Sequence, residues 1–284
     1  MTGLGRVAIL GTGQIGTMIG RALCRLPSEV VEEVAAWDPN PAGLEASLAL
    51  GGARRALASA GDALEAQLLV LAVPVGAAVG LAEQLGPHLR PGQLLLDTGS
   101  AKRVVVAAMR KWANPQAQAI GGHPLCGGTE SGPDSGEPDR LQGASFILCP
   151  VRDDPKAMAA ALRVVEVLGA RPVVVSAEEH DRVLARTSHL PHLTAAALAV
   201  LAETAAGSSG TRLSGSGLAG AVRLARSDPS MVASFIYANR DQVRAAAQEL
   251  AAEISQLLRA AEEGEEALAR ELAGARKAAR RLGG

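Results

Sequence analysis

The sequence predicts an α/β fold in which a doubly wound sheet is followed by an all-helical C-terminal domain. Short apolar runs alternate with helical stretches over residues 1–177, and a glycine-rich turn follows the first run. After Ala177 no strand-like run recurs. A chain of 284 residues is longer than the ~250 at which one hydrophobic core usually stops growing. We therefore expect two domains, 1–177 and 178–284.

The predicted strands are continuous apolar runs, which are typical of a parallel sheet covered on both faces. They lie at residues 7–10, 34–37, 68–72, 94–96, 119–120, 146–149 and 173–175. Helices fit between them, including one at about 155–168. This alternation predicts the doubly wound sheet.

The charge balance and the cysteines narrow the partners. With 28 basic and 29 acidic side chains, no single-sign field attracts nucleic acid or anionic lipid. Cys24, Cys126 and Cys149 are odd in number and lack a Cys-x-x-Cys, so neither a disulfide framework nor a metal site is indicated. We expect no signal peptide, no membrane span, a cytoplasmic location and a small-molecule substrate.

A Gly-x-Gly-x-x-Gly motif follows the first predicted strand and opens a helix. It consists of Gly11, Gly13 and Gly16, with Gln14 and Ile15 between them. Glycine allows the tight turn and lets the backbone approach a pyrophosphate, which the helix N-terminus attracts. The context indicates a Rossmann-type dinucleotide site.

Asp38 ends the second predicted strand, where a carboxylate can bond the ribose hydroxyls and repel a 2′-phosphate. This favours NAD, although Arg54 and Arg55 keep NADP open as an alternative. Asp38 also fits a simple turn in Asp-Pro-Asn-Pro. Val73 and Pro74 follow a later strand, either beside the nicotinamide or as a plain strand end.

Polar segments at 97–102 and 121–132 follow two neighbouring strands, and a third at 180–192 begins the helical domain. Ligands bind beyond the carboxyl ends of the strands in open α/β sheets. We therefore expect the first two segments to meet in one crevice, which the third could cover.

In this order the motifs resemble those of the prephenate and arogenate dehydrogenases of tyrosine biosynthesis, over nearly the whole chain. The shared segments are the glycine turn, Asp-x-Gly-Ser-x-Lys at 97–102, Gly-Gly-His-Pro with Gly-Thr-Glu-x-Ser-Gly at 121–132, His-Asp to Leu-Pro-His at 180–192, and Arg-Leu-Ala-Arg-Ser-Asp-Pro at 223–229. The resemblance implies an NAD-dependent oxidoreductase that decarboxylates prephenate to 4-hydroxyphenylpyruvate, with arogenate as the alternative substrate.

By the same resemblance His123 accepts the hydrogen bond of the hydroxyl that is oxidised, a role suited to an imidazole with a pKa near ~6.5. A structural histidine in a glycine-rich loop is the alternative. Ser100 would bond the same hydroxyl or the nicotinamide, or it would cap a helix that begins near Lys102.

The substrate carboxylates call for strong donors. Arg223 matches the family's substrate-binding arginine, whose fork suits a carboxylate, while a surface salt bridge is the alternative. His192 resembles the histidine that separates prephenate users from many arogenate-specific relatives. Ser188 and Thr129 are further candidate contacts, and His189 fits a structural role at the domain junction.

The chain departs from the family before Arg223. Many bacterial members have Gly-Phe-x-Asp-x-Thr-Arg there and a Trp nine residues later, where this chain has Gly-Leu-Ala-Gly-Ala-Val-Arg and Val232. A lysine of some relatives falls at Ala219. Substrate preference and tyrosine feedback therefore stay open.

Two other readings compete. A β-hydroxyacid dehydrogenase shares the two-domain plan but usually relies on a helical-domain lysine, which residues 188–201 lack. An inactive nucleotide-sensing protein predicts a broken catalytic set, whereas Ser100, His123, His192 and Arg223 are all present.

An apolar stripe marks the last part of the chain. Asp228 and Pro229 predict a helix start. Apolar residues then recur every seven positions, at Ile236, Val243, Leu250 and Leu257, with Ala247, Ile254 and Ala261 four residues after the last three. Such a stripe packs either in its own bundle or against a second subunit. We expect a homodimer.

Overall fold

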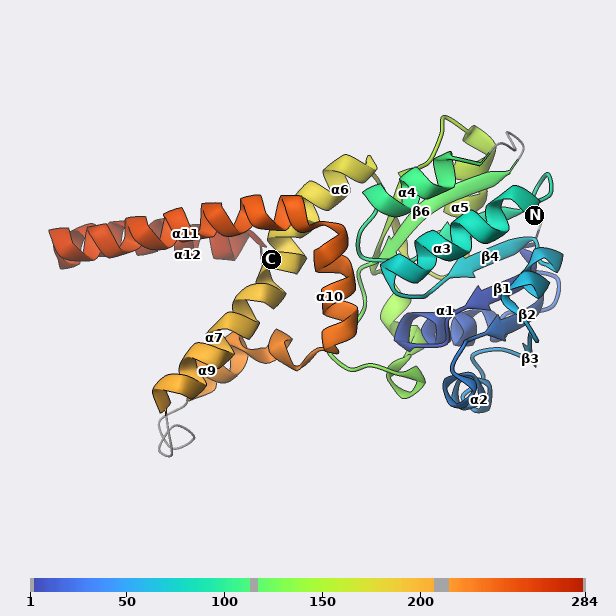
Figure 1. Ribbon diagram of the computed structural model, residues 1–284, viewed down its shortest axis with the longest axis horizontal. Coiled ribbons are helices and arrows are strands. Elements are labelled where there is room, and N and C mark those ends of the chain that lie inside the picture. The colour runs from blue at the N-terminus through green and yellow to red at the C-terminus, as the bar shows by residue number, and fades with distance from the viewer. Residues whose placement is uncertain (1–2, 113–116, 207–214, 283–284) are drawn as a thin grey trace. The chain divides into compact units, whose positions relative to one another are not determined.

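The computed structural model describes residues 3–112, 117–206 and 215–282. Its contacts divide the chain into two compact units, residues 1–239 and 240–284. The first unit contains the sheet, the helices that cover it and most of the helical region that follows. The second unit is a pair of helices (Figure 1).

The first unit is built on one eight-stranded sheet in the order β3-β2-β1-β4-β5-β6-β7-β8. The strands are β1 (Gly5–Leu10), β2 (Val31–Trp37), β3 (Arg55–Ala56), β4 (Leu68–Leu71), β5 (Leu94–Asp97), β6 (Gln118–Pro124), β7 (Ser145–Pro150) and β8 (Arg171–Val174). The predicted fold class is confirmed. The short β3 was not predicted, because its two exposed residues carry no apolar run.

Two of the described strands, β7 and β8, run against the other six. β6 and β7 pair antiparallel, with His123 opposite Ile147, whereas the other neighbouring strands are parallel. The connection between them contains two 3₁₀ turns, η3 (Pro133–Ser135) and η4 (Pro138–Leu141), and no crossover α-helix. A parallel pairing needs a crossover, so the chain returns beside β6 in the opposite direction.

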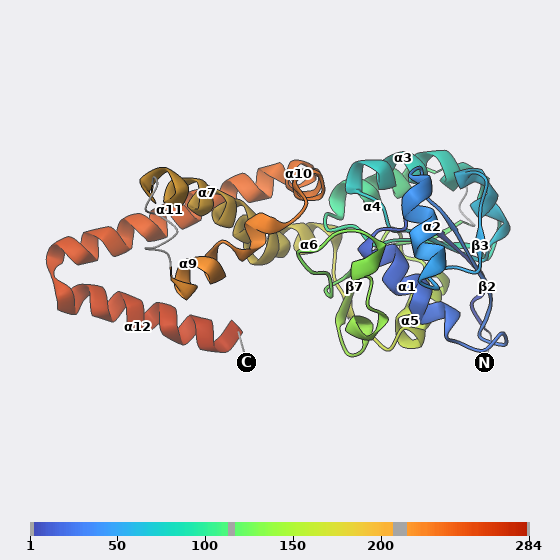
Figure 2. The same ribbon diagram turned by 90° about the horizontal axis from the view of Figure 1, so that it is seen from below.

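Helices cover both faces of the sheet, as Figures 1 and 2 show for α3 and α4 on one side and α1 and α5 on the other. Val7 and Ile9 of β1 pack in the core with α1 and α5, and Ala8 and Leu10 in the core with α3 and α4. The helices that connect the strands are α1 (Gln14–Cys24), α2 (Pro41–Ala49), α3 (Val75–Leu85), α4 (Arg103–Arg110) and α5 (Pro155–Val167), with 3₁₀ turns η1 (Ala60–Glu65) and η2 (Gly86–His88).

The helical region begins with α6 (Ala177–Leu184), a π-helical turn η5 (Ala185–His189) and α7 (Leu190–Ala206). It continues with α9 (Ser216–Ala221), the 3₁₀ turn η7 (Arg223–Arg226) and α10 (Pro229–Ala238). Ala177, Leu184 and Phe235 are buried in the same core as α3 and the sheet. The first compact unit therefore reaches Asn239, and the boundary expected at 177/178 stays a prediction.

The helix start predicted at Asp228 is confirmed, because its carboxylate caps α10 by accepting the backbone N–H of Met231 at 2.8 Å. The apolar stripe is interrupted, because α10 ends at Ala238, between Ile236 and Val243. The second unit consists of α11 (Arg240–Glu263) and α12 (Glu265–Leu282), joined at Gly264 with φ +131°.

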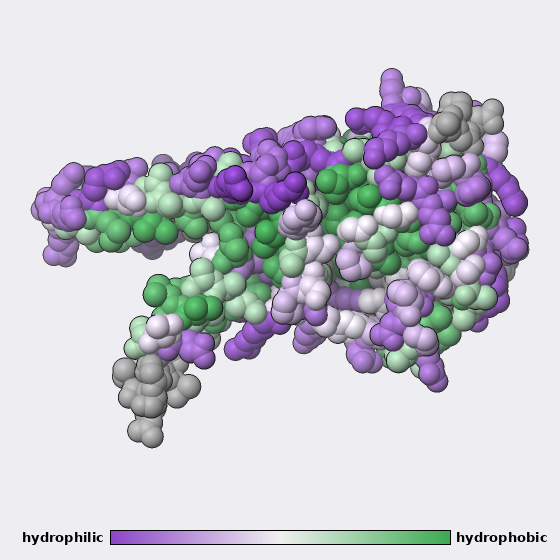
Figure 3. All heavy atoms as spheres, viewed as in Figure 1, coloured by the Kyte–Doolittle hydropathy of each residue, from purple (hydrophilic) through white to green (hydrophobic). Residues whose placement is uncertain are grey.

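The α11–α12 pair leaves apolar side chains uncovered. Figure 3 shows an apolar strip along one side of this pair. Ile254 is 48% exposed, Leu258 61% and Leu272 49%. In the described ranges no helix is both long and apolar enough to cross a membrane.

Candidate active site

The glycine turn has the geometry that the motif predicts. Gly11 adopts φ +100°, which favours glycine, and its N–H donates to the Trp37 carbonyl at 2.8 Å. A Cβ at Gly16 would lie 1.9 Å from the Gly11 carbonyl oxygen, so helix α1 packs directly on the turn. A Cβ at Gly13 would meet nothing within 4 Å. The backbone at Gly13 is thus open to a ligand at the N-terminus of α1.

A cavity of about 230 Å³ opens at this turn, beyond the carboxyl ends of β4 and β5. The predicted residues Gln14, Ile15, Val73, Pro74 and Ser100 all line it. The remaining lining comes from Gly13, Ala72, Val75, Thr98, Gly99, from the segment Glu130, Ser131 and Gly132, and from Asp228, Met231, Ser234 and Phe235 at α10. Two of the polar segments therefore meet in one crevice, and α10 closes one side of it.

Asp38 is bonded to the glycine turn. Its Oδ2 accepts from the backbone N–H of Thr12 at 2.7 Å and from the Thr12 hydroxyl at 3.0 Å, and its Oδ1 accepts from the Asn40 N–H at 2.8 Å. Arg54 and Arg55, which favoured NADP as the alternative cofactor, both bond other groups of the protein. Arg55 forms an ion pair with Glu33 at 3.0 Å, and Arg54 donates to the Cys24 carbonyl at 3.3 Å.

A buried ion pair joins the ends of β5 and β6. Asp97 and Lys102 are both fully buried and paired, and Nζ of Lys102 also donates to the Gly122 carbonyl at 2.6 Å. Asp97 in turn accepts the N–H groups of Gly99 at 2.9 Å and Gly122 at 3.1 Å. Because a buried charge needs such partners, the pair holds the loop of Ser100 against the strand of His123. Lys102 had no assigned role in the sequence, where a lysine after a strand looks like a surface residue.

His123 lies on β6 and is only 8% exposed. Its Nδ1 lies 2.9 Å from Nε2 of His180, and Nδ1 of His180 lies 2.8 Å from Oδ1 of Asp181. His180 is 1% exposed and Asp181 0%. The three side chains form one buried hydrogen-bonded row from α6 to β6. The sequence marked His180 and Asp181 as part of a motif but assigned them no role.

This environment favours neutral imidazoles. Burial, followed by the neighbouring His180, Lys102 and His189, holds the pKa of His123 well below its usual value. Burial also lowers the pKa of His180, although its bond to Asp181 acts in the opposite direction. Burial raises the pKa of Asp181, but the bonds from His180 and from the backbone of Lys102 and Arg103 outweigh it, so the net shift is downward.

The alternative role of Ser100, as the N-cap of the helix that begins near Lys102, is not seen: the Ser100 side chain does not cap α4. The helix begins at Arg103 without a side-chain cap from its own segment. The carboxylate of Asp181 on α6 caps the helix instead, because it accepts the N–H groups of Lys102 at 2.7 Å and Arg103 at 3.0 Å. Ser100 itself is part of the cavity lining.

His189 lies at the junction of the sheet with the helical region, as expected. Its Nε2 lies 3.0 Å from the Ser100 carbonyl and its Nδ1 lies 3.2 Å from the side-chain amide of Asn239. That amide also donates to the Asp181 carbonyl at 2.7 Å. Burial lowers the pKa of His189 to about 4.

None of the other predicted substrate residues is in the lining of this cavity, and neither is His123. His192 packs edge-on against Phe235, with ring centroids 5.4 Å apart, and Phe235 lines the cavity. Burial lowers the pKa of His192; a hydrogen bond with the backbone of Leu224 acts in the opposite direction, and Arg223 adds a smaller lowering effect. Arg223 is exposed and has no ion pair among the residues that the structure describes. Ser188 and Thr129 are half-buried, and no hydrogen bond in the described ranges joins either side chain to His123.

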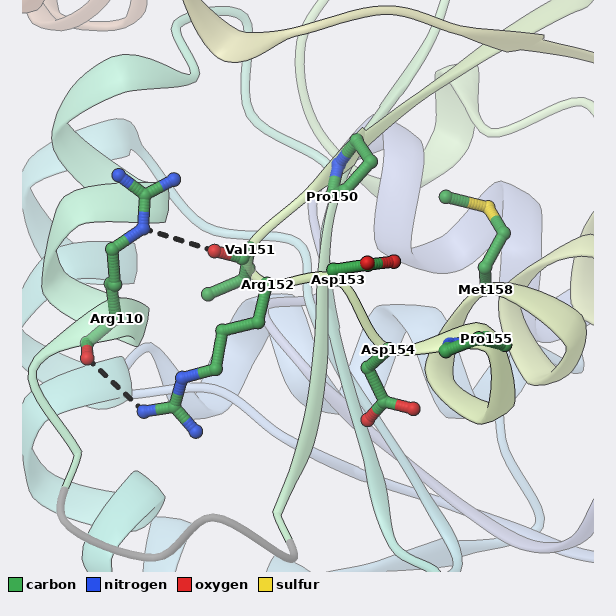
Figure 4. Close-up of a pocket in the computed structure, with 8 residues that line it drawn as sticks. All are labelled: Arg110, Pro150, Val151, Arg152, Asp153, Asp154, Pro155 and Met158. Atoms are coloured by element: carbon green, nitrogen blue, oxygen red, sulfur yellow. Dashed lines mark hydrogen bonds between the residues drawn. The ribbon is translucent and has the colours of Figure 1, made fainter.

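A second hollow of about 500 Å³ lies at the turn between β7 and α5 (Figure 4). The two arginine side chains in its lining bond backbone carbonyl groups. Arg110 donates to the Val151 carbonyl at 3.0 Å, and Arg152 donates to the Arg110 carbonyl at 3.1 Å. The described residues contain no group of three or more His, Cys, Asp or Glu side chains that could hold a metal ion.

A Rossmann-type sheet, a glycine turn open at the N-terminus of α1 and a buried histidine in a later polar segment are the features typical of dinucleotide-dependent dehydrogenases. Comparison with known proteins shows the family. The model of the prephenate dehydrogenase nucleotide-binding domain matches residues 20–174, and that of the prephenate dehydrogenase dimerization domain matches residues 176–273. The chain belongs to the prephenate dehydrogenase family.

Individual relatives agree. The chain is 34% identical over 197 residues to cyclohexadienyl dehydrogenase of Zymomonas mobilis, a match that covers 69% of this chain and 66% of that one. It is 30% identical over 138 residues to prephenate dehydrogenase of Lactococcus lactis, covering 48% of this chain and 37% of that one. The chain thus spans less than two thirds of the length of these relatives. Among solved structures, prephenate dehydrogenase of Aquifex aeolicus superimposes with a TM-score of 0.87 at 25% identity, over 97% of this chain and 99% of that one.

Proposed function

We propose that this protein catalyses the NAD-dependent oxidative decarboxylation of prephenate to 4-hydroxyphenylpyruvate. The observation that carries the proposal is His123, a buried imidazole on β6 whose lowered pKa keeps it neutral and whose ring bonds His180 of α6. The relatives named prephenate dehydrogenase support the substrate class. Cyclohexadienyl dehydrogenase of Zymomonas mobilis keeps arogenate as the alternative substrate.

The residues present fit NAD. Gly13 leaves room for a pyrophosphate, and the N-terminus of α1 supplies donors to it. Asp38 would bond the adenosine ribose, with Gly11, Gly16, Gln14 and Ile15 shaping the turn, and Val73, Pro74 and Ser100 would border the nicotinamide. Prephenate dehydrogenase of Aquifex aeolicus has been solved with hydroxyphenyl propionate and NAD+, and this chain shares its fold with a TM-score of 0.88 at 24% identity, over 98% of each chain. When bound, NAD+ supplies the hydride acceptor.

His123 would act on the ring hydroxyl. As hydride leaves the carbon, the hydroxyl proton becomes acidic and passes to the free nitrogen of the imidazole, so that a carbonyl forms. Loss of carbon dioxide then pushes an electron pair back to this oxygen as the ring becomes aromatic. The oxygen takes the proton back from His123, so the reaction consumes no proton overall.

The substrate's carboxylates need cationic partners. Arg223 has a guanidinium without an ion pair in the described part of the chain, and its fork could hold a carboxylate in a bidentate bond. We assign His192, Ser188 and Thr129 to further substrate contacts and Ser100 to the ring hydroxyl or the nicotinamide. His192 supports prephenate over arogenate by its resemblance to the family.

The α11–α12 pair supports a homodimer, because its exposed Ile254, Leu258 and Leu272 need cover and the region matches the family's dimerization domain. The cytoplasmic location stays a prediction from cysteine usage.

The test is a rate measurement on purified protein. NADH absorbance is followed with NAD+ and either prephenate or arogenate, and then with NADP+. We expect turnover on prephenate with NAD+. Turnover on arogenate alone would move the substrate to the alternative. Absence of turnover with either substrate and both cofactors would overturn the function.

A further inference from the structure

The buried row behind His123 has one consistent pattern of protons. Asp181 accepts at every contact, since its oxygens already take the N–H groups of Lys102 and Arg103. Nδ1 of His180 therefore carries the proton of the 2.8 Å bond to Asp181. A neutral His180 then presents a lone pair at Nε2, so Nδ1 of His123 must donate across the 2.9 Å contact. The lone pair of His123 is left on Nε2.

We propose that His180 and Asp181 are positioning residues for the reaction: they fix His123 in the tautomer with Nε2 unprotonated and share the proton that it receives. This inference rests on the proposed function, because it assigns the two residues to the step in which the ring hydroxyl is oxidised. Neither His180 nor Asp181 is in the lining of the cavity, so a direct contact with the substrate is not the role proposed for them.

The proton transfer balances within the row. Nε2 of His123 takes the hydroxyl proton, and Nδ1 of His123 releases its own proton to Nε2 of His180. His180 becomes an imidazolium that keeps its Nδ1 proton on the Asp181 carboxylate. When the ring oxygen recovers its electron pair, both protons move back by one position. No oxidant or further reactant is required.

Electrostatics favours this direction of transfer. The groups that act on the two rings are Lys102 before α4, Asp97 on β5, His189 on η5 and Asp181 on α6. Arg103 on α4 pairs with the same Asp181 carboxylate at 3.2 Å. Lys102 disfavours a positive charge on either ring, whereas the Asp181 carboxylate bonds the ring of His180 and not that of His123. A proton on His180 therefore lies beside a carboxylate, and the two imidazoles titrate as one pair.

The first experiment compares His180→Gln with the wild type over a range of pH. Glutamine can bond both neighbours but cannot take a proton. We expect kcat to fall by about tenfold or more, less than the ~10²–10⁴ expected for loss of the base itself. KM for prephenate and NAD+ binding should stay within about threefold of the wild-type values. Because the pair loses its better proton site, the acid limb of the kcat profile should move to lower pH.

The exposed His88 provides the matched control. His88→Gln is the same chemical change outside the site, and it should leave kcat and the pH profile unchanged. A His180→Gln enzyme whose acid limb stays in place or moves to higher pH would overturn the inference, since His180 would then be a packing residue or a repulsive neighbour. A wild-type protein without turnover would instead refute the proposed function.

A second measurement needs no variant, in case His180→Gln fails to fold. Nitrogen-15 NMR of histidine rings in the wild-type protein at neutral pH reports the tautomer of each ring directly. The row predicts a proton on Nδ1 and none on Nε2 for both His123 and His180. A proton on Nε2 of either ring would break the row and refute the inference.

Discussion

Asp38 and Arg223 show how single residues set what the protein binds. Asp38 is already held by Thr12 at 2.7 Å and therefore keeps its carboxylate at the glycine turn before any cofactor arrives. Arg223 is exposed without an ion pair in the described ranges, so binding an anion costs it no existing partner. One residue is preorganised for a ribose and the other is available for a carboxylate.

Replacing Asp38 with Asn should weaken discrimination against NADP. The change keeps an acceptor for Thr12 and removes the charge that repels a 2′-phosphate. We expect kcat/KM for NAD+ to fall and that for NADP+ to rise, so that their ratio drops by about tenfold, which corresponds to about 1.4 kcal/mol. Initial rates with each cofactor give the ratio. An unchanged ratio would remove Asp38 from cofactor selection.

Much of the residue-level site could be predicted because it lies in local motifs. The glycine turn, Val73, Pro74 and Ser100 follow strands directly, so strand order brings them to one cavity. The row His123, His180 and Asp181 could not be assembled in the same way, since 57 residues separate the two histidines in the contact. Only the packing of α6 against α4 and β7 brings them together.

At the scale of elements, the N-terminus of α1 depends on two glycines in different ways. A Gly16→Ala substitution would place Cβ 1.9 Å from a backbone oxygen, so helix and turn must separate. A Gly13→Ala substitution meets nothing within 4 Å in the protein and would obstruct only the ligand.

We therefore expect Gly16→Ala to be destabilised by about 1–3 kcal/mol, as for other overpacked sites. Gly13→Ala should unfold close to the wild type while binding NAD+ more weakly. Urea unfolding and NAD+ titration of both variants separate these effects. Equal losses of stability in the two variants would contradict the assignment of Gly13 to the ligand.

The junction of η5 with the β5 loop should be sensitive to acid. The pKa of His189 is lowered by burial to about 4, so the unfolded chain takes up a proton first as pH falls below ~6.5. The neutral ring thus contributes stability that is complete above ~6.5 and is lost progressively toward pH 4, about 3 kcal/mol in all.

Denaturant unfolding between pH 7.5 and pH 4.5 measures this loss. His189→Gln can still donate to the Ser100 carbonyl but cannot titrate, so its stability should depend less on pH than that of the wild type. A variant with the same pH dependence would show that other groups cause the loss.

Helix and strand positions were predictable where an apolar run was long enough, as for β1 and β4. Two features were not. The direction of β7 depends on the connection from β6, which contains only 3₁₀ turns. The end of α10 depends on Asn239, whose buried amide bonds His189 and the Asp181 carbonyl. The heptad stripe continues past this position, so its pattern contains no sign of the break.

For the whole molecule, the α11–α12 pair should decide the oligomeric state. Leu258 is 61% exposed on α11, and a charge there would oppose burial against a second copy. We expect Leu258→Glu to shift the mass measured by light scattering toward the monomer without loss of helical circular dichroism. Exposed Glu262→Gln is a control on the same helix and should not change the mass. A wild type that is already monomeric would refute the dimer.

The most direct test of the account compares wild type with His123→Asn for formation of NADH and 4-hydroxyphenylpyruvate from prephenate. The account predicts equal amounts of both products from the wild type, and a kcat lower by ~10²–10⁴ in the variant with NAD+ affinity unchanged. Wild-type rates in His123→Asn would contradict it, because the buried imidazole would then play no part in the chemistry.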